Sequence, residues 1–215
     1  MPCNCCEITD RTFGEQEAKS QLRDYRRKGP AKHTRLILEA IRSLKIKNTI
    51  LLDVGGGIGA IHHELLEDVA STAMHVDASS AYLKEAKDEA ARRGHSGRVT
   101  FIHADFTDVE SQLPQADVVT LDRVVCCYPD FRRLLKAAAG HSQRALALTY
   151  PREAWYLRLG FPIMNLIQRI QKDPFRIFLH PISEMDSLLR SEGFERVDLH
   201  RLFVWEMALY QRTAD

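Results

Sequence analysis

Residues 51–60 read Leu-Leu-Asp-Val-Gly-Gly-Gly-Ile-Gly-Ala, an apolar strand that ends on an acid and runs directly into a glycine-rich turn. Glycine adopts positive φ without steric penalty and lets a ligand approach the main chain closely. The spacing of Gly55, Gly57 and Ala60 fits the G-x-G-x-x-A pattern of dinucleotide-binding loops. The stretch therefore predicts a cofactor loop between a buried strand and a helix.

Asp53 helps to distinguish between two kinds of cofactor. It lies two residues before the first glycine, where a carboxylate would repel a pyrophosphate at the helix N-terminus. A cationic ligand would be attracted instead. S-adenosylmethionine carries a sulfonium and an ammonium group and no phosphate, so we predict it as the cofactor. The glycine spacing alone leaves an NAD(P)-dependent oxidoreductase as an alternative.

The composition fits one α/β domain with a sizeable core. The chain has 215 residues, 45% of them hydrophobic, and its 30 Lys and Arg nearly balance its 29 Asp and Glu. This balance gives no reason to expect a nucleic-acid partner. The sequence contains neither a long uncharged apolar run nor the pattern of a signal peptide. We therefore expect a cytoplasmic protein without a membrane span.

Short apolar strands alternate with helices along most of the chain. Two N-terminal helices are expected, over 12–28 and after the Gly29-Pro30 break. Strands are expected at 49–54, 73–76, 99–104, 117–121 and 145–149. Further helices are expected from about residue 58 and over 81–92, 130–139 and 183–192. Two β-rich runs at the end, 196–202 and 205–210, predict an antiparallel hairpin. The order predicts an α/β, doubly wound, mostly parallel seven-stranded sheet with helices on both faces.

Acids end three successive strands of the predicted sheet. Asp53, Asp77 and Asp105 hold these positions, and the carboxyl ends of parallel strands meet at one edge. Over about residues 45–150 the chain resembles the class I, Rossmann-like S-adenosylmethionine-dependent methyltransferases, whose first motif is an acid followed by G-x-G-x-G. The resemblance implies a single methyltransferase domain over 45–215, after an N-terminal tail and helical preface over 1–44.

The resemblance also implies roles for the first two motifs. The backbone of Gly55, Gly57 and Gly59 would face the methionyl part of the cofactor, with Asp53 preceding it. Asp77, with Ala78 beside it, would accept the two ribose hydroxyls. An acid after a strand is also a common N-cap or turn residue, so each position has a structural alternative.

Later positions complete the site that the resemblance implies. Asp105 would take the adenine amino group and Phe106 would flank the ring. Asp122 and Arg123, after the fourth strand, would contact the methionyl moiety; a salt-bridged turn is the alternative for them. In the helical preface, Tyr25 and Arg26 would pair with the methionine carboxylate. The alternative is that their helix is simply a solvated surface.

An acceptor hydroxyl or carboxyl can need a base. We select His180 and Tyr128 as candidate catalytic residues, because His titrates near neutrality and Tyr can orient an acceptor. His180 precedes Pro181, and a structural role is the alternative. His62 and His63, early in the first helix after the glycine loop, are expected to face solvent.

The cysteines predict no metal site. Cys3, Cys5 and Cys6 lie at the start of the chain, and their spacing is not that of a zinc finger. Cys126 and Cys127 are expected to be small buried hydrophobes. Their place near the predicted methyl donor leaves a thiol or metalloid acceptor as an alternative.

The apolar segment 152–172 bears on the acceptor. It contains Pro162, so it predicts one kinked helix or two short ones. Core packing is the alternative, but other helices already cover the sheet, and we favour a lid over an apolar acceptor. Residues 145–181 are also similar to magnesium-protoporphyrin O-methyltransferases.

The predicted function is methyl transfer to a small, partly apolar acceptor at oxygen, by direct SN2 displacement. The chain lacks the Asn/Asp-Pro-Pro-Tyr/Phe pattern with which similar enzymes hold a planar amino group, and this argues against nucleobase or glutamine N-methylation. A non-catalytic methyltransferase-like module that only binds the cofactor is a further alternative.

Overall fold

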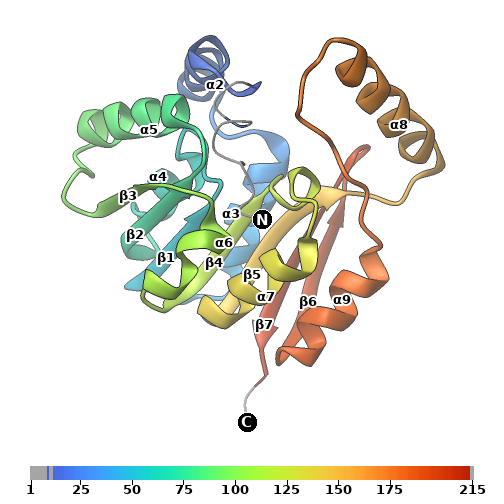
Figure 1. Ribbon diagram of the computed structural model, residues 1–215. Helices are drawn as coiled ribbons and strands as arrows, with labels where there is room; N and C mark the ends of the chain where they lie inside the picture. Colours follow the sequence, from blue (N-terminus) through green and yellow to red (C-terminus); the bar gives the residue numbers. More distant parts are fainter. Residues whose placement is uncertain (1–8, 10–11, 214–215) are drawn as a thin grey trace.

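In the computed structural model, which describes residue 9 and residues 12–213, seven strands form one sheet in the order β3-β2-β1-β4-β5-β7-β6 (Figure 1). The strands are β1 (Thr49–Val54), β2 (Ala70–Asp77), β3 (Val99–His103), β4 (Ala116–Asp122), β5 (Ser142–Pro151), β6 (Phe194–Arg201) and β7 (Trp205–Arg212). The first five are parallel, and β7 runs antiparallel to both β5 and β6. The predicted seven-stranded sheet with an antiparallel terminal hairpin is confirmed.

Helices cover both faces of the sheet. They are α2 (Glu15–Lys28), α3 (Lys32–Ser43), α4 (Ala60–Leu65), α5 (Ser80–Arg93), α6 (Phe106–Val109), α7 (Phe131–His141), α8 (Trp155–Ile170) and α9 (Ile182–Ser191). Local signals fix several of their ends. Side chains cap the N-termini of three of them, Ser79 for α5, Asp105 for α6 and Asp130 for α7.

Alternation of side chains along β1 separates two core layers. Leu52 and Val54 belong to the layer that contains the buried faces of α7 and α9. Leu51 belongs to the layer formed with α3 and α4. Because successive side chains of a strand point to opposite faces, Asp53 lies on the same face as Leu51, beneath α4.

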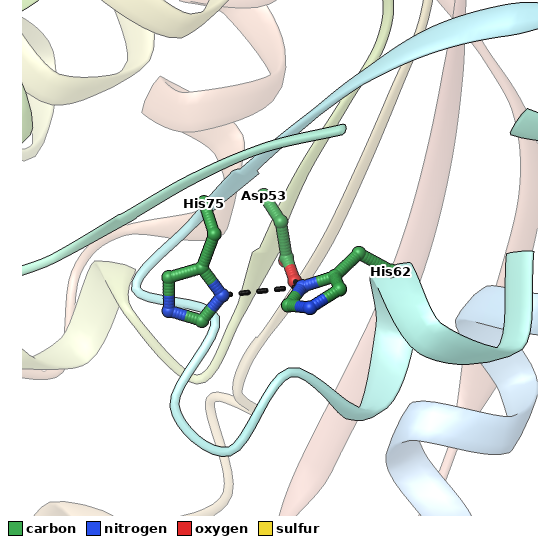
Figure 2. Close-up of side chains that lie close together, drawn as sticks. All are labelled: Asp53, His62 and His75. Carbon is green, nitrogen blue, oxygen red and sulfur yellow. Dashed lines mark hydrogen bonds and ion pairs between the residues drawn. The ribbon is translucent and has the colours of Figure 1, made fainter. Parts of the chain in front are cut away.

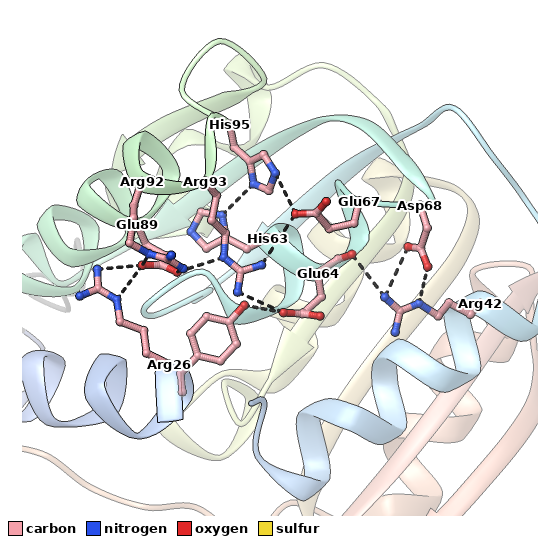
Figure 3. A network of polar contacts seen from close by, with 11 residues as sticks. Arg26, Arg42, His63, Glu64, Glu67, Asp68, Glu89, Arg92, Arg93 and His95 are labelled. Atoms are coloured by element: carbon pink, nitrogen blue, oxygen red, sulfur yellow. Dashed lines mark hydrogen bonds and ion pairs between the residues drawn. The ribbon is translucent and has the colours of Figure 1, made fainter. Parts of the chain in front are cut away.

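The helical preface docks through α2, which packs on α5 at one end of the molecule (Figure 1). Arg26 of α2 pairs with the buried Glu89 of α5 at 2.8 Å, and Figure 3 shows this contact within a larger polar network. The Tyr25 hydroxyl donates to Glu64 of α4 at 2.7 Å. Side chains of the preface therefore bind the helices beside the glycine loop.

Three local features differ from the sequence analysis. The short helix α6 was not predicted, and β2 begins three residues before the predicted strand. Segment 152–172 contains one helix, α8, which continues through Pro162. Across residue 9 and residues 12–213, none of the helices combines the length and the apolar composition needed to cross a membrane.

Candidate functional site

A cavity of about 610 Å³ opens at the carboxyl ends of the central strands. The loop after β1, the end of β2, the start of α6 and the loop after β4 form one side of it. The other side comes from α8, the segment that follows it and the start of β7, through residues such as Phe161, Met164, Phe175, Phe178 and Trp205. The volume is within the range of small-molecule sites.

The glycine loop meets the cavity through two of its glycines. Gly55 and Gly57 line it at φ 61° and 56°, and a Cβ on Gly55 would lie 2.5 Å from Val124. Gly59 does not line the cavity. It is the left-handed N-cap residue of α4 at φ 82°, and a Cβ there would lie 2.6 Å from the Nε2 atom of His62. The glycines are therefore needed for two reasons, cavity access and packing beneath the loop.

Asp77 lies on the cavity wall with Ala78 beside it. Its Oδ2 accepts from the backbone N–H of Gly57 at 2.8 Å, and its Oδ1 accepts from that of Ser79 at 2.7 Å. Burial raises the pKa of Asp77 to about 6, although these two hydrogen bonds favour its ionised form. The carboxylate is thus fixed at the rim and keeps lone pairs for a ligand.

Asp105 and Phe106 also line the cavity. Asp105 caps α6 by accepting from the backbone N–H of Thr107 at 3.0 Å. It also accepts from the Tyr128 hydroxyl at 2.6 Å, and burial together with this carboxylate raises the pKa of Tyr128. Tyr128 lines the cavity, and its hydroxyl donates to Asp105 and thereby orients that acid.

Asp122 and Arg123 meet the cavity at the end of β4. Two threonine hydroxyls hold the Asp122 carboxylate, that of Thr34 at 2.6 Å and that of Thr149 at 2.5 Å. Arg123 has a left-handed backbone at φ 61°, and its N–H donates to Thr149. Its exposed guanidinium forms no ion pair with a described residue, so it is available to an anionic group in the cavity.

Besides Gly59, four predicted site residues do not line the cavity; they are Tyr25, Arg26, His180 and Asp53. Tyr25 and Arg26 do not line the cavity, because their polar groups bind Glu64 and Glu89. His180 also lies off the cavity wall. Its Nε2 lies 2.9 Å from the Tyr128 carbonyl and 3.2 Å from that of Val125, so it braces the loop after β4 and is not placed to act as a base.

Asp53 lies beneath the glycine loop and not on the cavity. Its side chain is fully buried, accepts from Thr120 Oγ1 at 2.8 Å and lies 3.2 Å from His62 Nδ1. The prediction that His62 and His63 face solvent is wrong, since both are fully buried. The short helix α4 lies on the sheet, and its first turn lies over β1 and β2.

Several cavity residues were not selected from the sequence. The rings of Phe13 and Phe175 meet edge to face with centroids 5.2 Å apart, and Phe13 lies 6.1 Å from the ring of Tyr82. Cys126 and Cys127 line the cavity with their sulfurs 3.8 Å apart. Cys3, Cys5 and Cys6 lie outside the described residues. The sequence did place Cys126 and Cys127 near the predicted methyl donor, and Tyr82 lies on the buried face of a predicted helix. Phe13 and Phe175 gave no signal in the sequence.

Comparison with known proteins identifies the fold. Residues 51–144 match the model of a family described as a methyltransferase domain. This match covers less than half of the chain, and the fold of the whole chain is the Rossmann-like fold of class I S-adenosylmethionine-dependent methyltransferases. No curated protein matches the chain by sequence.

Solved structures support the assignment of the methyltransferase fold. Magnesium protoporphyrin IX methyltransferase (ChlM) from Synechocystis PCC 6803 with bound SAH is 18% identical, with a TM-score of 0.74, over 98% of this chain and 100% of that one. 1,6-Didemethyltoxoflavin-N1-methyltransferase from Burkholderia thailandensis is 16% identical, with a TM-score of 0.68, over 97% and 88%. The [4+2]-cyclase SpnF is 17% identical, with a TM-score of 0.71, over 100% and 99%.

The cavity lining fits S-adenosylmethionine, the cofactor bound in a structurally similar methyltransferase. Two glycines without Cβ atoms border the cavity, and three carboxylates line it, those of Asp77, Asp105 and Asp122. Negative charge suits a ligand with a sulfonium and an ammonium group, and disfavours a pyrophosphate. The lining therefore favours S-adenosylmethionine over the dinucleotide of the oxidoreductase alternative.

Proposed function

We propose that the protein transfers the methyl group of S-adenosylmethionine to an oxygen atom of a small, partly apolar acceptor inside this cavity. The observation that carries the proposal is the contrast between the two sides of the cavity. Carboxylates and bare backbone border the side at the strand ends, whereas aromatic and apolar side chains such as Phe161, Met164 and Phe175 border the other. The first side suits the cofactor and the second suits the acceptor.

The cofactor would be held by the residues at the strand ends. Asp77 would accept from the ribose hydroxyls, and Phe106 would pack on the adenine beside Asp105. Arg123, whose guanidinium has no ion-pair partner among the described residues, would bind the methionine carboxylate. When bound, S-adenosylmethionine supplies an electrophilic methyl group on a positively charged sulfur.

The acceptor side would position its ligand and exclude water. Phe175 is buried and Trp205 is half-buried, and both line the cavity. Phe161 and Met164 extend from α8 to the same wall. Rigid apolar walls hold an acceptor near the methyl group and displace solvent, which is the main contribution that positioning makes to such a reaction.

The lining also favours an acceptor oxygen that is already ionised. No histidine of the described residues lines the cavity, and the Tyr128 hydroxyl is bound to Asp105. A carboxylate or phenolate oxygen needs no base before it attacks, whereas an alcohol does. Arg176, whose guanidinium binds the backbone carbonyls of Asp173 and Phe175 at the cavity wall, adds positive charge on the acceptor side.

Titration calorimetry with S-adenosylhomocysteine tests the cofactor site first. We expect binding to the wild-type protein and an affinity lower by about tenfold or more in Asp77→Ala. Asp88→Ala, which removes an exposed acid of α5, is the matched control and should bind normally. Failure of the wild type to bind, or equal affinity in Asp77→Ala, would contradict the proposed site.

Labelled S-adenosylmethionine then tests the transfer. Incubated with small-molecule extracts, the protein should place label on an apolar product, and alkali should release that label as methanol if the acceptor is a carboxylate. A label that resists alkali would indicate an ether or an N-methyl group. Cofactor binding without any labelled product would favour the non-catalytic module.

A further inference from the structure

Side chains of three neighbouring strands form one row beneath the glycine loop. Asp53 of β1 is the register partner of His75 on β2 and of Thr120 on β4. Partners in adjacent parallel strands point to the same face, and here that face is covered by α4. His62 projects from the first turn of α4 onto the row, and Figure 2 shows its ring meeting Asp53 and His75.

The ligand-type atoms of this cluster are close together. His62 Nδ1 lies 3.2 Å from Asp53 Oδ2 and 3.1 Å from His75 Nδ1, and one atom from each residue lies within 4.8 Å of the others. All three side chains are fully buried. Zinc binds nitrogen and oxygen ligands at about 2.0–2.2 Å in a tetrahedron, which places neighbouring ligand atoms about 3.3–3.5 Å apart. Two of the observed spacings, 3.2 Å and 3.1 Å, are close to this value, and all three residues offer a ligand atom within 4.8 Å of the others.

The ring nitrogens of this cluster have few partners within the chain. His62 Nδ1 has two close neighbours, Asp53 Oδ2 and His75 Nδ1, and a neutral imidazole has a single proton to serve both contacts. The Nε2 atoms of His62 and His75 are buried and have no hydrogen-bond partner among the described residues. Buried polar groups are normally paired, so the cluster is short of partners.

The residue types of the cluster also suit a metal. A histidine binds a metal through the lone pair of a neutral ring nitrogen, and an aspartate binds it as a carboxylate. Two imidazoles and a carboxylate form a donor set typical of zinc.

We propose that Asp53, His62 and His75 bind one zinc ion beneath the cofactor loop. This site goes beyond the methyl-transfer function and does not depend on it. The ion would join β1, β2 and α4, the three elements that carry and support the loop. Gly56 and Gly59 pack directly on the ligands, since a Cβ on either would lie 2.6 Å from Asp53 Oδ2 or His62 Nε2 respectively. The metal is structural, because it lies under the loop and away from the cavity wall.

Metal titration of the intact protein tests this proposal. After treatment with a chelator, cobalt(II) should bind at one equivalent and give visible d–d bands that zinc(II) abolishes. His62→Gln and His75→Gln should each lower the affinity by about tenfold or more. His141→Gln is the matched control, because it alters a buried histidine of α7 on the other face of the sheet, and it should leave the titration unchanged.

If a variant fails to fold, X-ray absorption of the zinc-loaded wild type still identifies the ligands of the metal. We expect a first shell of nitrogen and oxygen only, with multiple scattering from two imidazoles. A sulfur ligand, or a cobalt–thiolate charge-transfer band, would assign the metal to cysteines and overturn the site. Absence of stoichiometric binding in the wild type, or equal binding in a folded His75→Gln variant, would overturn it equally.

Discussion

The glycine loop tolerates no side chain at several of its positions, because one added Cβ atom would collide with a neighbour. Gly55 and Gly57 keep the cavity side of the loop free of side chains. Gly56 has no positive φ, yet a Cβ there would lie 2.6 Å from Asp53 Oδ2 and 2.8 Å from a ring carbon of His75. Its requirement for glycine is therefore steric and comes from the buried side of the loop, which faces away from any cofactor.

Gly56→Ala is expected to destabilise the fold by about 1–3 kcal/mol, as overpacking of a rigid interior does. Gly140→Ala is the control, because a Cβ at this exposed position of α7 meets nothing within 4 Å. It should be neutral or stabilise by up to about 1 kcal/mol, since alanine favours helix. Urea denaturation measures both. Equal effects of the two substitutions would contradict the steric account.

At the same scale, two of the three acids predicted at the rim of the sheet lie there, but other side chains lie where the sequence did not predict them. Asp77 ends β2, Asp105 follows β3 as the N-cap of α6, and both line the cavity. Asp53 was expected to face the cofactor, although strand alternation already places it with Leu51, on the face that α4 covers. Helical periodicity could not predict the burial of His62 and His63, because a six-residue helix offers too few turns to define a face.

At the scale of the elements, α8 is unusual in what it leaves exposed. Only Leu157 of its sixteen residues is buried, while apolar side chains such as Leu159 and Ile170 are 62% and 73% exposed. Phe161 and Met164 instead reach the cavity. The helix therefore has an apolar outer surface as well as a cavity-lining edge.

Phe161→Ser should weaken binding of an apolar probe such as 1-anilinonaphthalene-8-sulfonate by about fivefold, because it removes a cavity wall worth about 1 kcal/mol or more of apolar contact. Leu159→Ser is the matched control on the outer side of α8 and should have a smaller effect. Fluorescence titration of both variants measures the difference. A larger loss in Leu159→Ser would place the probe on the outer surface of the helix.

The strands and longer helices were predictable because their apolar periodicity reflects burial against a sheet. The four-residue α6 was missed, since a segment that short has no periodicity and depends on the Asp105 cap. The aromatic wall was also missed. Phe13, Tyr82, Phe175 and Trp205 come from four separate segments, and only the tertiary fold brings them to one cavity.

For the molecule as a whole, the polar network of Figure 3 ties the N-terminal helix to the sheet domain. Glu89 is fully buried and pairs with Arg26 of α2 and with Arg92 and Arg93 of its own helix. Burial tends to raise the pKa of Glu89, but these three guanidinium groups outweigh that effect and lower it to about 2. The docking of α2 therefore depends on a charged interior carboxylate.

The pH dependence of stability follows from this shift. The pKa of Glu89 is lower in the folded protein than in the unfolded chain, so its contribution is complete above about pH 4.5 and fades as the pH falls toward 2. Glu89→Gln should destabilise the protein by about 1–3 kcal/mol at pH 7. Denaturation at several pH values should give a difference from wild type that shrinks with acid.

Glu85→Gln provides the control for this experiment. Glu85 is a buried acid of the same helix that forms no ion pair with a described residue. Its substitution should have a smaller effect at pH 7. A Glu89→Gln difference that stays constant from pH 5 to pH 2.5 would mean that the carboxylate charge does not hold α2 in place.

The exposed surface of α8 also affects the intrinsic fluorescence of the protein, because it carries a tryptophan. The chain has two tryptophans. Trp155, at the start of α8, is 73% exposed, whereas Trp205 lies in the cavity wall. The intrinsic emission is therefore the sum of a water-exposed indole, open to collisional quenchers, and an indole next to the ligand. Replacing Trp155 with phenylalanine leaves an emission that comes from the cavity alone.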